Sequence, residues 1–180
     1  TTSDGTPAGA NIIFNDSITG SGNTLDLDAG TDGNIVFANG STFGESSDYL
    51  GAIKINSATN VGGDTAVATA TGTIYAASLA ITASGTINLG AVTTSGSVTT
   101  NGDTTLSGNI TTAGGTVTFT QAVILASDVA ITTGSLTAGD IVFSSTVSET
   151  TSGADDLELT AGTGNVVFGG QVGTDDTSYL

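Results

Sequence analysis

The residues of this sequence that are best able to do chemistry are acids. Asp26, Asp28 and Asp32 place three carboxylates close together, next to glycines that favour a turn. Carboxylate oxygens are ligands that Ca²⁺ prefers, so these three residues are weak calcium candidates. Their spacing departs from that of an EF-hand loop, and Gly62-Gly63-Asp64 resembles a nonapeptide calcium repeat only once. A solvated acidic face is the simpler interpretation. We expect no cofactor, with Ca²⁺ as the one ion that these residues leave open.

Adjacent acids are the second group with chemical potential. Glycoside hydrolysis uses two carboxyl groups, and Asp155/Asp156 and Asp175/Asp176 form such pairs. Neighbouring residues of a strand point to opposite sides, so the two acids of a pair cannot act on one substrate. The chain also has no Trp to stack against a sugar and no His. We therefore expect no enzymatic activity and predict no catalytic residues.

The charge composition excludes several other functions. The 180 residues include 17 acids and a single basic residue, which gives a formal net charge of −16. One basic residue cannot neutralise a phosphate backbone, so we expect no nucleic-acid partner. The absence of Cys and His excludes disulfides, thiol chemistry and zinc sites built from these ligands. No apolar run is long enough for a membrane span.

Two surface features suggest weaker hypotheses. Thr-x-Thr pairs, such as Thr116 with Thr118, would order water or bind a glycan if they formed one flat ladder, but they do not recur at a fixed period. Lys54 invites comparison with lysines that form isopeptide crosslinks in bacterial surface proteins. It lies between Ile53 and Ile55, however, so alternation turns it outward to solvent. Both features are compatible with ordinary strand surfaces.

The elements that position these residues are short strands. Gly, Thr, Ser, Val and Ile dominate the sequence, and these residues are poor helix formers. Apolar and polar residues alternate in Leu25–Asp28, Ile53–Ile55, Val117–Phe119 and Leu157–Leu159, and Gly, Asn, Asp or Ser bound each segment. This pattern predicts an all-β fold made of many short strands.

Two families of strands recur with one shared period of about 26 residues, which is typical of a solenoid. We predict that the inward residues stack in two structural core columns. The first column contains Phe14, Phe37, Phe119, Phe143 and Phe168, and the second contains Leu27, Ile55, Ile81, Ile131 and Leu159. The predicted fold is a parallel β-helix of about seven coils. The alternative is an antiparallel β-sandwich, which would not need this period.

A longer repeat of about 130 residues overlies the coils. Asn11–Phe14 matches Asp140–Phe143, Leu25–Thr31 matches Leu157–Thr163, and Asn34–Phe37 matches Asn165–Phe168. We predict a linker or arm over residues 1–10, one complete super-repeat over 11–139 and the start of the next over 140–180. The chain is expected to come from a longer tandem array.

The segments Leu157–Phe168 and Gly115–Phe119 resemble the degenerate strand repeats of giant bacterial surface proteins. They are similar to those of the filamentous haemagglutinin class of β-helical adhesins. This resemblance covers about residues 10 to 180, and its motifs concern architecture far more than activity. It implies an extracellular or cell-surface location, which agrees with the absence of Cys and the scarcity of basic residues.

The sequence therefore predicts a non-enzymatic structural segment of a secreted surface adhesin or extracellular filament. We expect it to act as a rigid shaft or spacer and to assemble end to end. The expected partners are copies of itself or adjacent repeats, head to tail, and possible further partners are cell-surface glycans. The alternative is a calcium- or glycan-binding module of a surface protein.

Overall fold

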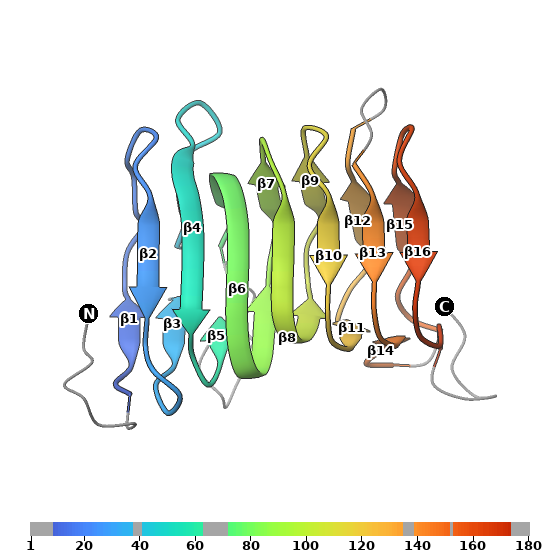
Figure 1. The fold of residues 1–180 in the computed structure, drawn as a ribbon, viewed down its shortest axis with the longest axis horizontal. Helices are drawn as coiled ribbons and strands as arrows, with labels where there is room; N and C mark the ends of the chain where they lie inside the picture. The colour runs from blue at the N-terminus through green and yellow to red at the C-terminus, as the bar shows by residue number, and fades with distance from the viewer. Residues whose placement is uncertain (1–8, 38–40, 63–71, 135–138, 152, 174–180) are drawn as a thin grey trace.

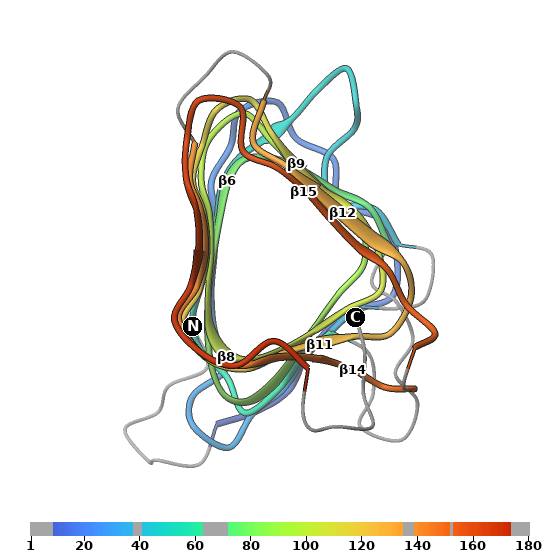
Figure 2. The ribbon, with the colours of Figure 1, turned by 90° about the vertical axis from the view of Figure 1, so that its right-hand side faces the viewer.

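The computed structural model describes residues 9–37, 41–62, 72–134, 139–151 and 153–173, and in these ranges the chain is all-β. The strands form one sheet in which every strand pairing is parallel. This sheet coils into a nearly closed, solenoid-like shape (Figure 1) with a three-sided outline when seen along its long axis (Figure 2). The alternative of an antiparallel sandwich is therefore wrong. Within these ranges no helix could cross a membrane.

Each side of the outline is a stack of parallel strands, and we name the three sides by their strands. Face A contains β1 (Ile12–Phe14), β3 (Ile35–Phe37), β5 (Val61–Gly62), the ends of β6 (Ile74–Leu89) and β8 (Val98–Leu106), β11 (Val123–Leu125) and β14 (Val147–Glu149). Face B contains the start of β6, β7 (Val92–Thr94), β9 (Ile110–Thr112), β12 (Val129–Thr132) and β15 (Leu157–Thr160). Face C contains β2 (Leu25–Asp28), β4 (Leu50–Ser57), the middle of β6, the start of β8, β10 (Val117–Phe119), β13 (Ile141–Phe143) and β16 (Val166–Phe168).

The chain visits the faces in the order A, B, C and then returns to A. Successive positions in register on face A are Ile12, Ile35, Val61, Ile87, Thr104, Val123, Val147 and Val172. Toward both ends of the sheet these positions are 23 to 26 residues apart, but Ile87 to Thr104 is 17 residues and Thr104 to Val123 is 19. The 16-residue strand β6 follows all three faces without a loop, whereas longer passages place their extra residues in loops at the corners (Figure 2).

Alternation in the strands separates an apolar interior from a polar surface. In β10 the side chains of Val117 and Phe119 are fully buried, and Thr118 between them is partly exposed. Burial of an apolar side chain contributes about 1.5–3 kcal/mol, so stacked columns of such residues are the main source of stability. Ring stacking adds to this: Phe119 and Phe143 have centroids 5.1 Å apart, and Phe143 and Phe168 repeat the same spacing.

The observed columns differ from the two that the period predicts. Phe14 and Phe37 stack on face A, whereas Phe119, Phe143 and Phe168 stack on face C. The face C column begins with Leu27, Ile55 and Ile81, continues through Thr100 and then reaches the three phenylalanines. Ile131 and Leu159 belong to face B. The prediction of one phenylalanine column and one leucine column is therefore wrong. The two coils from Ile87 to Val123 are shorter than the others, so each strand after them lies two faces further along the A, B, C order than a constant period would place it.

The same shift affects the long sequence repeat. Ile12–Phe14 lies on face A, but its match Ile141–Phe143 lies on face C. Leu25–Asp28 lies on face C, and its match Leu157–Thr160 lies on face B. The second copy of the repeated sequence is thus rotated about the long axis of the sheet relative to the first. Residues 1–8 of the predicted linker lie outside the described residues.

Truncation of one phenylalanine column tests the interior assignment. Phe143→Ala removes a ring that is fully buried between two others, and we expect a loss of about 3–5 kcal/mol of unfolding free energy. Phe168→Ala removes the terminal ring of the same column, which is 41% exposed, and should cost no more than about 1.5 kcal/mol. Urea unfolding followed by circular dichroism measures both values. Equal losses would contradict the assigned burial.

Candidate functional site

A ladder of asparagine side chains joins successive coils at the corner before face A. The Asn11 side-chain oxygen accepts hydrogen bonds from the backbone N and the side-chain Nδ2 of Asn34, at 2.9 and 3.2 Å. Asn34 repeats the arrangement with Asn60, at 3.1 and 2.9 Å. Asn60 in turn accepts from the Thr86 backbone N at 2.9 Å. Each side chain thus satisfies a backbone donor of the next coil that the turn would otherwise leave without a partner.

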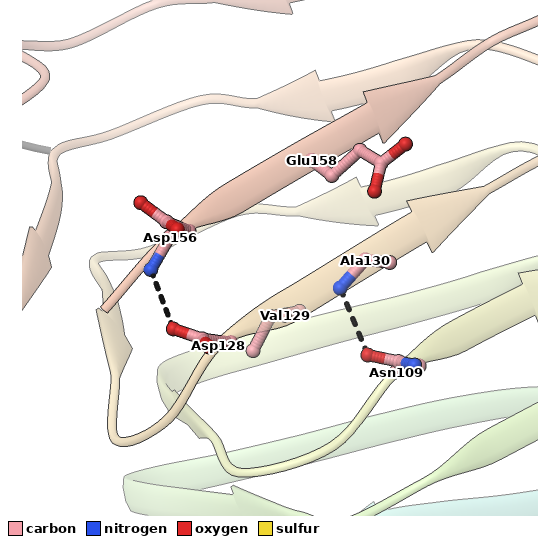
Figure 3. A pocket seen from close by; sticks show the side chains of 6 residues that line it. All are labelled: Asn109, Asp128, Val129, Ala130, Asp156 and Glu158. Carbon is pink, nitrogen blue, oxygen red and sulfur yellow. Dashed lines mark hydrogen bonds between the residues drawn. The ribbon is translucent and has the colours of Figure 1, made fainter.

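Side chains at the other two corners form the same kind of hydrogen bond between coils. Before face C, Asp140 Oδ1 accepts from the backbone N and the Nδ2 of Asn165, at 2.7 and 3.3 Å. Before face B, Asp128 Oδ1 accepts from the backbone N of Asp156 at 2.9 Å, and Figure 3 shows this bond beside the corresponding contact of Asn109. In every case the earlier coil supplies the acceptor and the later coil supplies the donor. The ladders therefore have a direction that runs along the shaft.

The polar surface on face B includes a shallow pocket of about 350 Å³ (Figure 3). It is lined by Asn109, Asp128, Val129, Ala130, Asp156 and Glu158. Asn109 Oδ1 accepts from the Ala130 backbone N at 2.9 Å, so both Asn109 and Asp128 are already used to join coils. Within the described ranges, no group of three or more acids, His or Cys is placed to hold a metal ion. Side chains that line the pocket thus form hydrogen bonds between neighbouring coils.

The calcium candidates have other contacts. Asp26 Oδ1 accepts from the Asn56 side chain, and Asp26 lies in register with Lys54 on the neighbouring strand. Asp28 Oδ1 accepts from the Gly30 backbone N at 2.9 Å, which closes a tight turn. Asp32 is exposed in the segment that follows. Two of the three candidate carboxylates, those of Asp26 and Asp28, therefore accept hydrogen bonds from their own chain.

The backbone of one of the two acid pairs takes part in local hydrogen bonds. The backbone N of Asp155 donates to the Glu149 carboxylate in the loop after β14. The backbone N of Asp156 donates to Asp128 Oδ1 at the corner before face B. Asp175, Asp176 and Asp64 lie outside the described residues.

The corner at residues 149–155 is held by a single carboxylate. Glu149 accepts hydrogen bonds from the backbone N of Gly153, Ala154 and Asp155, the last two at 3.1 Å. Gly153 has a φ of 68°, a conformation that favours glycine and lets these N–H groups converge. The hydrogen bond from Gly153, with those from Asp155 and Ala154, lowers the pKa of the Glu149 carboxyl below its ordinary value.

The end of the shaft at the last coil presents an unusual apolar surface. Val166, Val167, Phe168 and Val172 are each between 41% and 44% exposed. An open cavity of about 470 Å³ there is lined by Asp156, Leu157, Glu158, Leu159, Phe168 and Val172. At the opposite end Ile13 on β1 is 57% exposed. Among the described residues, no strand covers β15 or β16 on this outer side. The two ends are therefore candidate contact surfaces, which we call the last-coil end and the first-coil end.

Sequence reasoning missed the corner ladders, although a signal for them was present. Asn or Asp directly precedes an apolar strand at Asn11, Asn34, Asn60, Asp140 and Asn165. A turn residue explains each of these positions individually, and only the register reveals that Asn11, Asn34 and Asn60 stack at one corner and Asp140 and Asn165 at another. Phe43 was also missed: it is 1% exposed on face B and packs edge-on against Phe37, with centroids 4.4 Å apart.

Comparisons with known protein families, with curated proteins and with solved structures find no match. The resemblance to filamentous haemagglutinin-type adhesins stays a prediction.

The Glu149 contacts predict a pH dependence. A carboxyl whose pKa is lowered by folding stabilises the folded loop at neutral pH, and this contribution is lost as the pH falls through the lowered pKa. The amide NMR signals of Gly153, Ala154 and Asp155 should therefore titrate together, with a midpoint below the ordinary glutamate value. Glu149→Gln should abolish this common titration, whereas Glu158→Gln should preserve it. Independent titrations of the three amides would contradict the arrangement.

Proposed function

We propose that this chain is a non-enzymatic shaft segment of an extracellular, cell-surface adhesin or filament. The observation that carries the proposal is the parallel register on face C, which runs from one end of the described sheet to the other. On face C, in-register pairs connect Leu27 at one end to Phe168 at the other through every intervening coil. Such a stack resists bending between its described coils, since each pairs with the next on all three faces, through strands or through the single bridges at Ile18, Phe43 and Val172. Resistance to bending is the property that a spacer needs.

The finer architecture in this proposal is a parallel β-helix of about seven coils, each advancing about 4.8 Å along the axis. The eight in-register positions on face A, from Ile12 to Val172, support this number. The coils are of unequal length, so the proposal does not require the constant period of about 26 residues that the sequence suggested.

The surface chemistry supports a structural role over a binding role. Asp26, Asp28, Asp128 and Asp140 all accept hydrogen bonds from their own chain. The net charge of −16 keeps shafts soluble and separated. An extracellular location is supported by the composition, since the chain has no Cys and one basic residue. End-to-end association of copies is the remaining part of the proposal, and the apolar last-coil end supports it.

Spin labels at the two ends test the rigidity of the shaft. The chain has no Cys, so Ile13→Cys and Val167→Cys introduce two unique, outward-facing labels at opposite ends. Double electron–electron resonance at low salt should give a narrow distance distribution, with an axial separation of roughly 30–35 Å. The pair Ile13→Cys and Val36→Cys, which lie side by side in register, gives a short-distance control through dipolar broadening of the continuous-wave spectrum. A broad end-to-end distribution would refute the shaft.

Calcium titration separates the shaft from a cation-binding module. A site that binds only the folded protein would stabilise it by about 2.7 kcal/mol when Ca²⁺ is present at 100 times its dissociation constant. Because Asp26 and Asp28 are engaged with their own chain, we expect Ca²⁺ to raise the melting temperature no more than Mg²⁺ at equal ionic strength. A rise specific to Ca²⁺ that Asp26→Asn removes would favour the binding module.

A further inference from the structure

We propose that the outer surface of face B binds an uncharged, linear polysaccharide, which lies along the long axis on a column of hydroxyl side chains. The column contains Tyr49, Tyr75, Thr93, Thr111 and Thr132. Face B is the side that carries β9 and β12 in Figure 2. The inference goes beyond the shaft proposed above, because it concerns the outer side of one face and neither the rigidity of the shaft nor its ends.

The parallel register aligns hydroxyl residues that lie at unequal distances in the sequence. Tyr75 pairs with Thr93, Thr93 with Thr111, and Thr111 with Thr132. The steps are 18, 18 and 21 residues, so a search for one fixed period does not find them. Paired strands are about 4.8 Å apart, so these four positions form a straight ladder about 14 Å long.

The hydroxyl groups of this ladder are not used by the chain itself. In the part of the chain that the structure describes, the hydroxyls of Tyr75, Thr93, Thr111 and Thr132 form no hydrogen bond. Their inward neighbours differ: the hydroxyl of Thr94 donates to a glycine carbonyl at 2.6 Å. Each free hydroxyl can donate one hydrogen bond and accept others, and sugar hydroxyls have the same capacity. The ladder is therefore complementary to a chain of sugars.

Two tyrosines form an aromatic platform at one end of the ladder. Leu50 pairs with Ala76, which brings Tyr49 beside Tyr75, and the two ring centroids are 5.8 Å apart with the planes tilted by 50°. Both tyrosines are partly exposed. A tyrosine ring offers an apolar surface and a polar hydroxyl, so it can stack on a sugar ring and also bond to it. This platform supplies the stacking surface for which the sequence has no Trp.

The residues beside the ladder leave room for a ligand. Ala91, Asn109 and Ala130 each lie two residues before one of the threonines, on the same side of the strand. Asn109 Oδ1 accepts from the Ala130 backbone N at 2.9 Å, which holds the Asn109 side chain against the next coil (Figure 3). The shallow pocket of about 350 Å³ opens next to these residues. A sugar ring can therefore contact both the ladder and the pocket.

Other linear ligands fit this face less well. An added peptide strand needs the free backbone edge of a strand, but β7 and β9 are each paired on both sides. A nucleic acid or an anionic polysaccharide would be repelled by the carboxylates of Glu45 and Asp48, beside the tyrosines, and of Asp128 and Glu158, which line the pocket. A lipid surface requires a broad apolar face, whereas this column is polar. An uncharged polysaccharide meets none of these obstacles.

Amide NMR titration with defined oligosaccharides tests the site and the ligand class. We expect a β-1,4-linked glucose hexamer, an extended and uncharged chain, to shift the signals of Tyr75, Thr93 and Thr111. The signals of Thr99 and Thr118 on face C should not move. Binding should be independent of salt, because the ligand carries no charge.

Two further oligosaccharides are controls for shape and for charge. The α-1,4-linked glucose hexamer has the same composition but follows a curved path. The β-1,4-linked mannuronate hexamer is extended but carries carboxylates. We expect both to bind at least about tenfold more weakly than the β-1,4-linked glucose hexamer, the second because like charges across a contact are costly.

Substitutions on the outer side of face B test the named residues. Thr111→Val keeps the shape of the side chain and removes the hydroxyl, and it should weaken binding by about two- to tenfold, the range for one net hydrogen bond. Tyr75→Ala removes the stacking surface and should weaken binding by about tenfold. The matched control Thr118→Val makes the same change on face C and should leave the affinity unaltered. Thermal melts establish that each variant is folded, and exposed Thr111 keeps the test valid if Tyr75→Ala is unstable.

The outcomes decide between the inference and its alternatives. Signal shifts confined to face C, or equal effects of Thr118→Val and Thr111→Val, would overturn the assignment to face B. Equal affinity for the curved hexamer would overturn the extended placement along the ladder, and tighter binding of mannuronate would overturn the ligand class. The absence of any shift at the highest soluble concentration of the β-1,4-linked glucose hexamer would refute the inference. The rigid shaft is decided separately by the spin-label distances.

Discussion

The parallel register between successive coils is the constraint on which the rest of this structure depends. A parallel strand pairs with the strand of the next coil residue by residue, so whatever points inward in one coil must stack on what points inward in the next. Face C shows the consequence, because Leu27, Ile55 and Ile81 lead without a break to Phe119 and Phe143. Stability is then shared between neighbouring coils, and no single coil has a core of its own.

Differences in the number of residues per coil are accommodated at the corners and not on the faces. Three faces fix the least number of residues in a coil, and β6 with its 16 residues approaches that limit. Longer coils must bulge outward at a corner, where backbone donors and acceptors lose their strand partners. Asn34 and Asp140 supply acceptors at these corners, because their side-chain oxygens accept hydrogen bonds from backbone N–H groups of the following coil. Inward-facing threonines supply donors: the hydroxyls of Thr94, Thr112 and Thr133 donate to glycine carbonyls at the adjacent corner. These corner side chains are thereby committed to the backbone of their own chain, which is the physical basis for proposing a structural function.

Rotation of the repeated sequence has consequences for any longer array. Because Ile12–Phe14 and Ile141–Phe143 lie on different faces, surface residues that match in sequence do not line up along the shaft. Acidic segments would follow a spiral around the axis and would not form one charged stripe. A partner that binds one copy of the repeat would therefore meet the next copy from another direction. A shaft tolerates this arrangement, whereas a flat repetitive binding surface does not.

Alternation and the strand-bounding residues of the sequence determined that this chain is built of short parallel-stacking strands with Val117, Phe119 and Ile141 inside. This was predictable because side-chain direction in a strand depends only on parity, which is a local property.

The face on which each strand lies was decided by the tertiary structure alone. It depends on the sum of all preceding coil lengths, so the two short coils after Ile87 moved Phe119, Phe143 and Phe168 away from Phe14 and Phe37. The corner ladders were hidden for the same reason: each Asn or Asp was visible in the sequence, but only the stacked coils bring Asn11, Asn34 and Asn60 into contact. Local patterns specify which side of a strand is buried, and only the accumulated register specifies what it is buried against.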